Sequence, residues 1–342
     1  MTRAFNGLFI LLFFLGSLAS AKMRLVEWHI ENVIAPFILS VRDSESPQNA
    51  SERYLKNLAK SPGLSELFNF GIPELKTTRF VELIPKDADH RILLQANSPA
   101  DYTKNSVRVE KFNSYFEKWN QENFLLPINP TLGLTFYEQR EVFDLIYENF
   151  AVYVGLGGDD VDPWFAHQEN FHARNFVSER DQAEIKLIQH FIRRGQSETN
   201  PLKKSFYFGT CRGSQIASVA LGYQLIQDIP FEVDTKLDHS EDWHTIRFLP
   251  TTHEILKQSS RNSNFKVNSL HHQAVIYKKG GFLELAALSS DGIVEATEFK
   301  NGRGLLIQFH AELMDNQLGE EILSQVVKAK DRTGAFTCNK LF

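Results

Sequence analysis

The segment FYFGTCRGSQIASVALGYQ, residues 206–224, decides the fold of this chain. It begins with aromatic and apolar residues, which suit a buried central strand. From Ile216 onward apolar residues recur at helical spacing. Gly209 and Gly213 flank Cys211 two residues away on either side, which is the pattern of a nucleophile elbow. The segment therefore predicts a strand, a sharp turn at Cys211 and an amphipathic helix.

The predicted turn gives Cys211 a chemical character. At a helix N-terminus the helix dipole and the free N–H groups favour a thiolate. The alternative is a small cysteine that only packs at a tight turn. Cys338 is the other cysteine of the chain, and a disulfide between the two would remove the nucleophile. We favour a free Cys211, because a large domain can be stable without disulfides.

The first 21 residues have the composition of a secretory signal peptide. Arg3 precedes an apolar run over residues 8–15, and Ala19 and Ala21 form a small-x-small cleavage site. The run is too short to be a convincing membrane span, although an uncleaved anchor remains an alternative. We therefore expect cleavage near Ala21 and export to the periplasm or the medium, with no stable membrane insertion afterwards.

Size and charge narrow the function further. The chain has 342 residues, a net charge of −5 and no basic run. This composition argues against a nucleic-acid partner. About 320 residues after the signal can bury a large core.

The chain divides into a less regular beginning and a regular remainder. Residues 22–89 form an N-terminal extension to which the sequence assigns no role, and residues 321–342 form a C-terminal tail. Between them, residues 90–320 alternate strand and helix patterns, including a helix from Asp181, its expected cap, to Arg193. Strands are expected over 91–96, 123–127, 150–156, 244–249, 265–267, 282–289, 294–299 and 305–309, and further helices over 107–120 and 137–147. This alternation predicts an α/β fold of three layers, with a mostly parallel central sheet and helices on both faces.

A second chemical motif lies near the end of that domain. The segment GLLIQFHAE, residues 304–312, reads as an apolar strand that ends in His310 and Glu312. Residues i and i+2 at a strand end point to the same side, so Glu312 could orient His310 towards Cys211. A cysteine nucleophile needs such an oriented base. Alone, a His-x-Glu pair after a strand is more often structural. The catalytic interpretation depends on its combination with the nucleophile elbow at Cys211.

Two further segments carry polar or glycine-rich patterns. The turn LGGDDVDP, residues 156–163, follows an apolar strand, and its backbone N–H groups could stabilise an oxyanion, although an ordinary glycine turn is the alternative. His271 and His272 suggest metal binding. Neighbouring residues of an extended chain point to opposite faces, so they make a poor chelate and we expect no metal.

Together these segments resemble the class I glutamine amidotransferase superfamily, and most of all its gamma-glutamyl hydrolase branch, which includes the gamma-glutamyl-gamma-aminobutyrate hydrolases. The resemblance is carried by GTCRGSQIASVALGYQLIQDIP (209–230), VNSLHHQAV (267–275), DGIVEATEF (291–299) and QFHAE (308–312). It covers residues 90–315, about two-thirds of the chain. Two segments depart from the branch: Asp159 replaces a third glycine, and Phe309-His-Ala-Glu312 stands where the branch has Trp-His-Pro-Glu. Neither change removes a group that the chemistry needs.

The resemblance implies roles for residues of three kinds. The catalytic set would be the nucleophile Cys211, the general base and acid His310, and the orienting Glu312. The oxyanion hole would be formed by the backbone N–H groups of Gly158 and Arg212. The glutamyl pocket would be lined by Gly157, Gln215, His272 and Gln273. The family needs no cofactor and no metal.

The expected function is therefore hydrolysis of γ-glutamyl amides through a glutamyl-thioester, with a small γ-glutamyl substrate as the partner. One alternative is an amidotransferase subunit that passes ammonia to a synthase. Others are a catalytically silent binding protein on the same fold and an exported peptidase or amidase that acts on peptidoglycan-like γ-linkages. A homodimer remains open.

Overall fold

The computed structural model describes residues 22–66, 75–84, 91–95, 106–198, 205–240, 242–252, 255–256 and 264–330. The expected signal peptide and Cys338 lie outside these residues. Among the described residues, no helix combines the length and the apolar character that crossing a bilayer requires.

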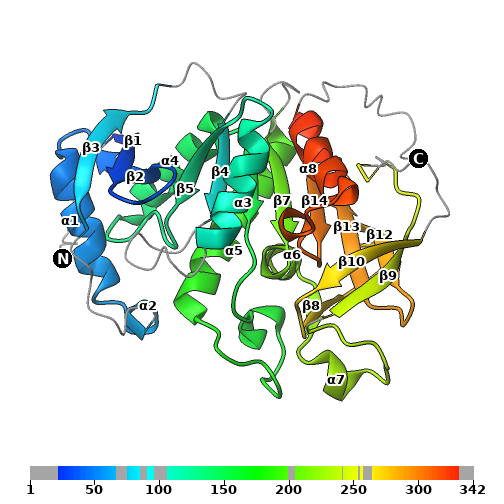
Figure 1. Cartoon of the computed structure of the whole chain (residues 1–342). Coiled ribbons are helices and arrows are strands. Elements are labelled where there is room, and N and C mark those ends of the chain that lie inside the picture. The colour runs from blue at the N-terminus through cyan, green and yellow to red at the C-terminus, as the bar shows by residue number, and fades with distance from the viewer. Residues whose placement is uncertain are drawn as a thin grey trace, which may run out of the picture.

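A 12-stranded sheet runs through the whole molecule (Figure 1) in the order β10-β9-β12-β13-β14-β7-β6-β4-β5-β2-β1-β3. The six central strands, from β14 to β2, are parallel, whereas both ends of the sheet are antiparallel. A separate pair, β8 and β11, is also antiparallel. The strands are β1 Met23–Ile30, β2 Phe37–Arg42, β3 Thr77–Glu82, β4 Arg91–Gln95, β5 Glu122–Leu126, β6 Val152–Gly155, β7 Phe206–Thr210, β8 Gln224–Ile226, β9 Asp242–Phe248, β10 Asn264–Ser269, β11 Ala274–Ile276, β12 Leu283–Ser289, β13 Val294–Phe299 and β14 Gly304–Ile307.

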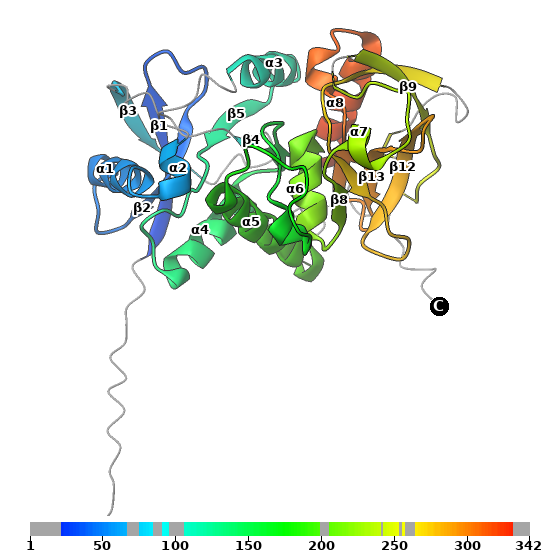
Figure 2. The same ribbon diagram turned by 90° about the horizontal axis from the view of Figure 1, so that it is seen from below.

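Helices cover both faces of the central strands (Figure 2), which confirms the predicted three-layer α/β fold. One core lies under α1, α3 and α8, and the other under α4, α5 and α6. Phe112 of α3 contacts the ring of Phe208 in β7 on the first face, and Phe191 of α5 contacts Tyr207 on the second. The helices are α1 Pro47–Leu58, α2 Pro62–Glu66, α3 Ser106–Glu117, α4 Phe136–Asn149, η3 Pro163–Ala166, α5 Ser178–Ser197, α6 Arg212–Ala220, α7 Ile229–Glu232, η5 Ala311–Leu313 and α8 Gln317–Lys330.

The N-terminal segment, whose role the sequence left open, continues the same sheet. Phe37 of β2 pairs in parallel with Leu125 of β5, and β1 and β3 follow in antiparallel order. Arg42 of β2 forms a two-pronged ion pair with Glu138 of α4, at 2.6 and 3.1 Å. This guanidinium lowers the pKa of Glu138 to about 2. Strands β1–β3 therefore join the rest of the molecule through both backbone pairing and a side-chain bridge.

Two local expectations were wrong, the first because of a long-range contact. Helix α5 begins at Ser178 rather than at Asp181, whose side chain is not a cap but is buried against Arg212. Strand β14 ends at Ile307 rather than at 309, because the chain then turns into η5. The second difference changes how His310 is held.

Because Phe37 is fully buried in the first core, Phe37→Ala tests whether β1–β3 and the rest of the sheet unfold together. We expect it to lower the free energy of unfolding by about 3–5 kcal/mol and to shift one common transition, measured by tyrosine fluorescence and circular dichroism. Phe136→Ala is the matched control, since this phenylalanine is 74% exposed. Two separate transitions, only one of them moved by Phe37→Ala, would refute a single cooperative unit.

Candidate active site

Cys211 lies at a tight turn between β7 and α6, in a backbone conformation that L-residues rarely adopt. Its φ is 51° and its ψ is −117°, and it occupies the N-cap position of α6. Close packing explains why the flanking residues are glycines. A Cβ on Gly213 would lie 2.0 Å from the carbonyl oxygen of Gly155 in β6, and one on Gly209 would lie 2.7 Å from that of Gly213. The predicted elbow is thus a place where a helix end meets two strands without room for side chains.

The surrounding hydrogen bonds hold Cys211 in this conformation. Its N–H donates to the carbonyl of Ile307 in β14 at 2.9 Å. Its own carbonyl accepts from the N–H groups of Ser214 and Gln215 at 2.9 and 3.2 Å. Strain of this kind costs on the order of 1–3 kcal/mol and persists only where the surroundings over-determine it. The thiol is free and buried.

His310 is clamped between two neighbouring segments. Its backbone N–H donates to Asn268 Oδ1 at 2.8 Å, and its carbonyl accepts from Asn268 Nδ2 at 2.9 Å. Its Nδ1 lies 2.7 Å from Glu312 Oε1, and both side chains are buried. The expected pairing of His310 with Glu312 is present, but through the 3₁₀ turn η5 instead of a strand end. Asn268, which lies in the segment VNSLHHQAV but was given no role there, orients the segment.

Cys211 and His310 perturb each other electrostatically. Burial opposes a charged imidazolium, but Glu312 and then Cys211 raise the pKa of His310 to about 10. Burial likewise raises the pKa of Cys211, but the charge and hydrogen bonding of His310 outweigh it and lower the pKa below its ordinary value. Nε2 of His310 has no hydrogen-bond partner among the described residues. The arrangement can therefore hold a thiolate–imidazolium pair.

Gly157 lies directly against this pair, and Gly158 lies against the side chain of Arg212. A Cβ on Gly157 would be 2.7 Å from Cε1 of His310 and 3.4 Å from Cβ of Cys211. A Cβ on Gly158 would be 3.4 Å from Cδ of Arg212. The structure thus brings the glycine turn and the first residue of α6, the two expected sources of oxyanion N–H groups, to the same place.

The side chain of Arg212 has a second role that the sequence did not reveal. It is buried and forms ion pairs with Asp181 and, at 2.6 Å, with Glu184 of α5. A third ion pair joins Arg180 to Glu184 at 2.9 Å. Two cations and two anions thus balance behind the elbow. The signal in the sequence was the helical spacing of Arg180, Asp181 and Glu184, which places all three on one face.

The expected glutamyl-pocket residues divide into bracing and lining groups. Gln215 is buried, and its Nε2 donates to the carbonyl of Gln273 at 3.0 Å and to Oε1 of Gln308 at 3.2 Å. Gln273 Oε1 in turn accepts from the N–H of Val161 at 3.3 Å. These two amides brace the site from within. His272 is partly exposed, and its Nε2 lies 2.8 Å from Oδ1 of Asp160.

A cavity of about 450 Å³ is lined by residues that follow β6 and β10, and Cys211 is not among its lining residues. The carbonyl of Leu270, one of its lining residues, lies 4.0 Å from the Cys211 sulfur. Asp159, which replaces the third glycine of the resemblance, stands exposed at this cavity and adds a negative charge to it. The other lining residues are Gly158, Asp160, Arg174, Asn175, Ser240, His271 and His272.

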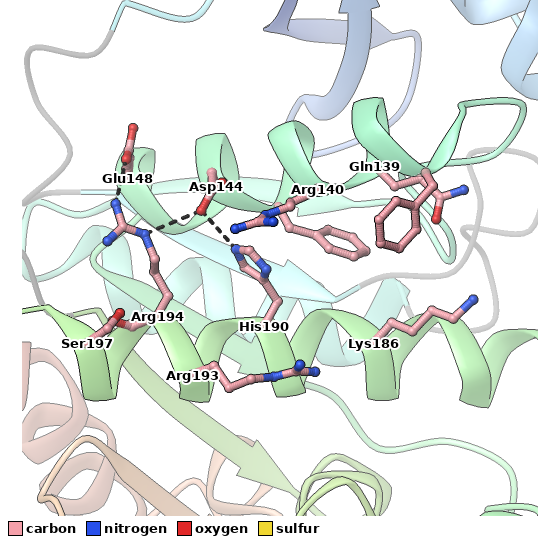
Figure 3. A pocket seen from close by; sticks show the side chains of 11 residues that line it. Gln139, Arg140, Asp144, Glu148, Lys186, His190, Arg193, Arg194 and Ser197 are labelled. Atoms are coloured by element: carbon pink, nitrogen blue, oxygen red, sulfur yellow. Dashed lines mark hydrogen bonds and ion pairs between the residues drawn. The ribbon is translucent and has the colours of Figure 1, made fainter. Parts of the chain in front are cut away.

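A larger groove of about 860 Å³ lies between α4 and α5 (Figure 3). Arg140, Lys186 and Arg193 line it, and His190 and Arg194 pair there with Asp144. None of the expected site residues lines this groove. Size alone does not make it the site, because the nucleophile and its base lie elsewhere.

Comparison with known proteins agrees with this geometry. The Peptidase C26 family model matches residues 108–312. The chain belongs to the Peptidase C26 family. The glutamine amidotransferase-like protein YvdE of Lactococcus lactis is 29% identical over 220 residues, or 63% of this chain and 84% of that protein. The glutamine amidotransferase-like protein RP404 of Rickettsia prowazekii is 27% identical over 56% of this chain and 81% of its own length.

A solved structure shows the same fold. The glutaminase domain of CTPS from Trypanosoma brucei, solved with bound acivicin, superposes with a TM-score of 0.51 at 15% identity, over 70% of this chain and 94% of that domain. This Peptidase C26 member is thus a class I glutamine amidotransferase-like protein, as its motifs predicted. Family membership supports a cysteine hydrolase or amidotransferase-like activity.

The strain at Cys211 predicts an unusual order of stability for two substitutions. At an ordinary site in a helix or strand, glycine is less stable than alanine by about 0.5–1 kcal/mol. Because φ is +51° here, Cys211→Gly relieves strain that Cys211→Ala keeps. We expect the glycine variant to be at least as stable in urea titrations. A glycine variant less stable by the ordinary amount would contradict the strain.

The Cys211–His310 pair predicts how thiol reactivity depends on pH. A thiolate exists above the thiol pKa, so alkylation by iodoacetamide falls as the pH drops through that value. We expect the midpoint for Cys211 to lie below that of an ordinary cysteine, and to rise in His310→Gln, which removes the stabilising cation. Rates are measured in a Cys338→Ser background, so that one thiol reports. An unchanged midpoint in His310→Gln would disprove the coupling.

Proposed function

We propose that this protein is a hydrolase of γ-glutamyl amide bonds. The observation that carries the proposal is the proximity of a strained, buried Cys211 to His310, whose Nδ1 is bonded to Glu312. His310 is left with one ring nitrogen for proton transfer. This is the arrangement that nucleophilic acyl transfer needs.

The first half of the reaction forms a thioester. The Cys211 thiolate attacks the γ-carbonyl carbon, a C–S bond forms, and the carbonyl electron pair moves onto oxygen. The N–H groups of Gly158 and Arg212 stabilise that oxyanion. As the intermediate collapses, the C–N bond breaks and His310 transfers its proton to the leaving amine. Glu312 keeps the imidazole in the required orientation throughout.

The second half releases glutamate. Water enters as the amine departs, and His310, now neutral, removes a proton from it. The hydroxide attacks the thioester carbonyl, and the same N–H groups hold the second oxyanion. Its collapse breaks the C–S bond and restores the thiolate beside the imidazolium. The cycle consumes one water and needs no external oxidant or reductant.

The charges around the cavity support a glutamyl substrate. The α-end of a γ-glutamyl group carries one ammonium and one carboxylate. The cavity is lined by charged residues of both signs. Asp159 and Asp160 would attract the ammonium group, and Arg174 would attract the carboxylate. His272, bonded to Asp160, fixes the position of that acid. The γ-carbonyl would then lie towards Cys211.

The names of the relatives favour a second candidate, a glutamine amidotransferase that hands ammonia to a partner. Both candidates share the thioester chemistry. They differ in the preferred leaving group, since an amidotransferase works on glutamine and depends on its acceptor. The signal-like composition of residues 1–21 supports export, which we also propose, and export would separate the protein from ATP-dependent synthases.

The test is turnover of a panel of γ-glutamyl amines and glutamine by the purified chain alone, with glutamate release as the readout. Cys211→Ala should reduce release to background, and His310→Gln should lower kcat by about 10²–10⁴-fold. His190→Gln, in the groove of Figure 3, is the matched control and should turn over normally. Mass spectrometry with a glutamine-mimicking alkylator should find one adduct, on Cys211. Full turnover by Cys211→Ala would refute the mechanism.

A further inference from the structure

A second cluster of buried ionisable side chains lies outside the proposed mechanism. It consists of His239, His244 of β9, His271 after β10, and Glu295 of β13. Their side chains are between 0 and 3% exposed. Ligand-type atoms of His239, His244 and Glu295 lie within 4.8 Å of one another. Residues from distant parts of the chain thus converge on one point in the antiparallel end of the sheet.

The distances resemble those between ligands of one metal ion. Glu295 Oε1 lies 2.8 Å from Nε2 of His244, 3.7 Å from Nδ1 of His239 and 3.8 Å from Nε2 of His271. Two ligand atoms about 2.0–2.1 Å from a tetrahedral zinc ion stand about 3.3 Å apart. The three distances from Glu295 Oε1 bracket this value, and the ligand-type atoms of His239 and His244 lie within 4.8 Å of each other. The imidazoles would therefore have to move towards one another to share one ion.

The hydrogen bonds of two of these histidines leave lone pairs facing the carboxylate. Nε2 of His239 lies 3.0 Å from Asp291 Oδ2, and Nδ1 of His271 lies 3.0 Å from the carbonyl of Gln273. Those nitrogens carry the protons in the neutral rings, because their partners can only accept. The opposite nitrogens, Nδ1 of His239 and Nε2 of His271, have no hydrogen-bond partner among the described residues.

Such an arrangement is costly without a cation. Acceptor nitrogens face a buried carboxylate whose Oε2 also has no partner in the described part of the chain. An unpartnered buried polar group destabilises the fold, and a charged one does so more strongly. A divalent cation between Glu295 and the imidazoles would satisfy these atoms together.

An outer layer of hydrogen bonds holds the cluster in place. Asp291, which orients His239, accepts from Thr235 Oγ1 at 2.5 Å and from the hydroxyl of Ser289. A carboxylate that fixes the far nitrogen of a histidine is the usual support of a metal-bound imidazole. The backbone N–H of His271 also donates to the carbonyl of His239 at 2.8 Å.

We propose that His239, His244 and Glu295, with His271 as the fourth ligand, form a structural site for a zinc-type divalent transition metal. Three imidazoles and one carboxylate suit Zn²⁺ and its neighbours, whereas Mg²⁺ and Ca²⁺ prefer oxygen ligands. The burial of all four side chains fits a closed, structural site. His271 therefore belongs to a metal site without His272, whose side chain faces Asp160 instead.

The position of this site indicates what a bound metal would do in the structure. His271 belongs to the segment 268–273, in which Asn268 clamps the backbone of His310 and the carbonyl of Leu270 approaches Cys211. A metal bound to His271 would anchor this segment against β9 and β13. The inference concerns metal binding itself and stands independently of the proposed γ-glutamyl activity.

The test uses the full chain, purified without a histidine tag, treated with a chelator and then titrated with ZnCl₂. We expect one equivalent of zinc by elemental mass spectrometry and calorimetry, and an unfolding temperature that rises with zinc concentration. CoCl₂ should give the intense visible absorption of a four-coordinate site. MgCl₂ at the same concentrations should have no effect.

Variants assign the ligands. Glu295→Gln keeps the size of the side chain and should weaken zinc binding by more than about 100-fold, whereas Asp291→Asn, which removes only the support of His239, should weaken it by about 10–100-fold. His190→Gln, which alters a surface His–Asp pair of similar geometry at 3.0 Å, should bind zinc like the wild type. Zinc bound at less than a tenth of an equivalent, or equal affinity in Glu295→Gln, would overturn the proposal. If a variant does not fold, the cobalt spectrum of the wild-type chain decides alone, and the absence of four-coordinate bands would overturn it too.

Discussion

The close approach of α6 to strands β6 and β7 is the constraint on which the rest of the structure depends. With 2.0 Å between a hypothetical Cβ of Gly213 and the carbonyl oxygen of Gly155, no other residue fits there without moving the helix. The approach forces Cys211 into a positive φ and presents its thiol beside the N–H groups of the helix end. The same contact brings the glycine turn after β6 within reach of His310. The expected nucleophile, the expected base and the glycine turn are thus brought together by one steric contact.

Electrostatic interactions also hold the residues around Cys211 in place. On one side of the elbow, the buried pairs of Arg212 with Asp181 and Glu184 fix the first residue of α6. Burying such charges is expensive, and it is tolerated where every charge is paired. On the other side, Glu312 makes a buried imidazolium at His310 favourable. The charge of His310 in turn lowers the pKa of Cys211 against the effect of burial.

How much the sequence could predict depends on how far apart along the chain the interacting residues lie. The elbow was predictable because Gly209, Cys211 and Gly213 are local. The pairing of His310 with Glu312 was also predictable, although the reason given, a strand end, was wrong. Asp181 was mistaken for a cap because its partner lies 31 residues away. The histidine and glutamate cluster was missed because β9, the segment after β10 and β13 meet only through sheet pairing.

The sheet is divided into a parallel centre and an antiparallel end, and each part holds different residues of the candidate site. Cys211 and the glycine turn stand on parallel strands, where the helix contact leaves little freedom. The segment with Leu270, His271 and His272 follows β10 at the antiparallel end. Because Asn268 of β10 clamps the backbone of His310, a displacement of this end of the sheet relative to the parallel centre would change the distance between His310 and Cys211.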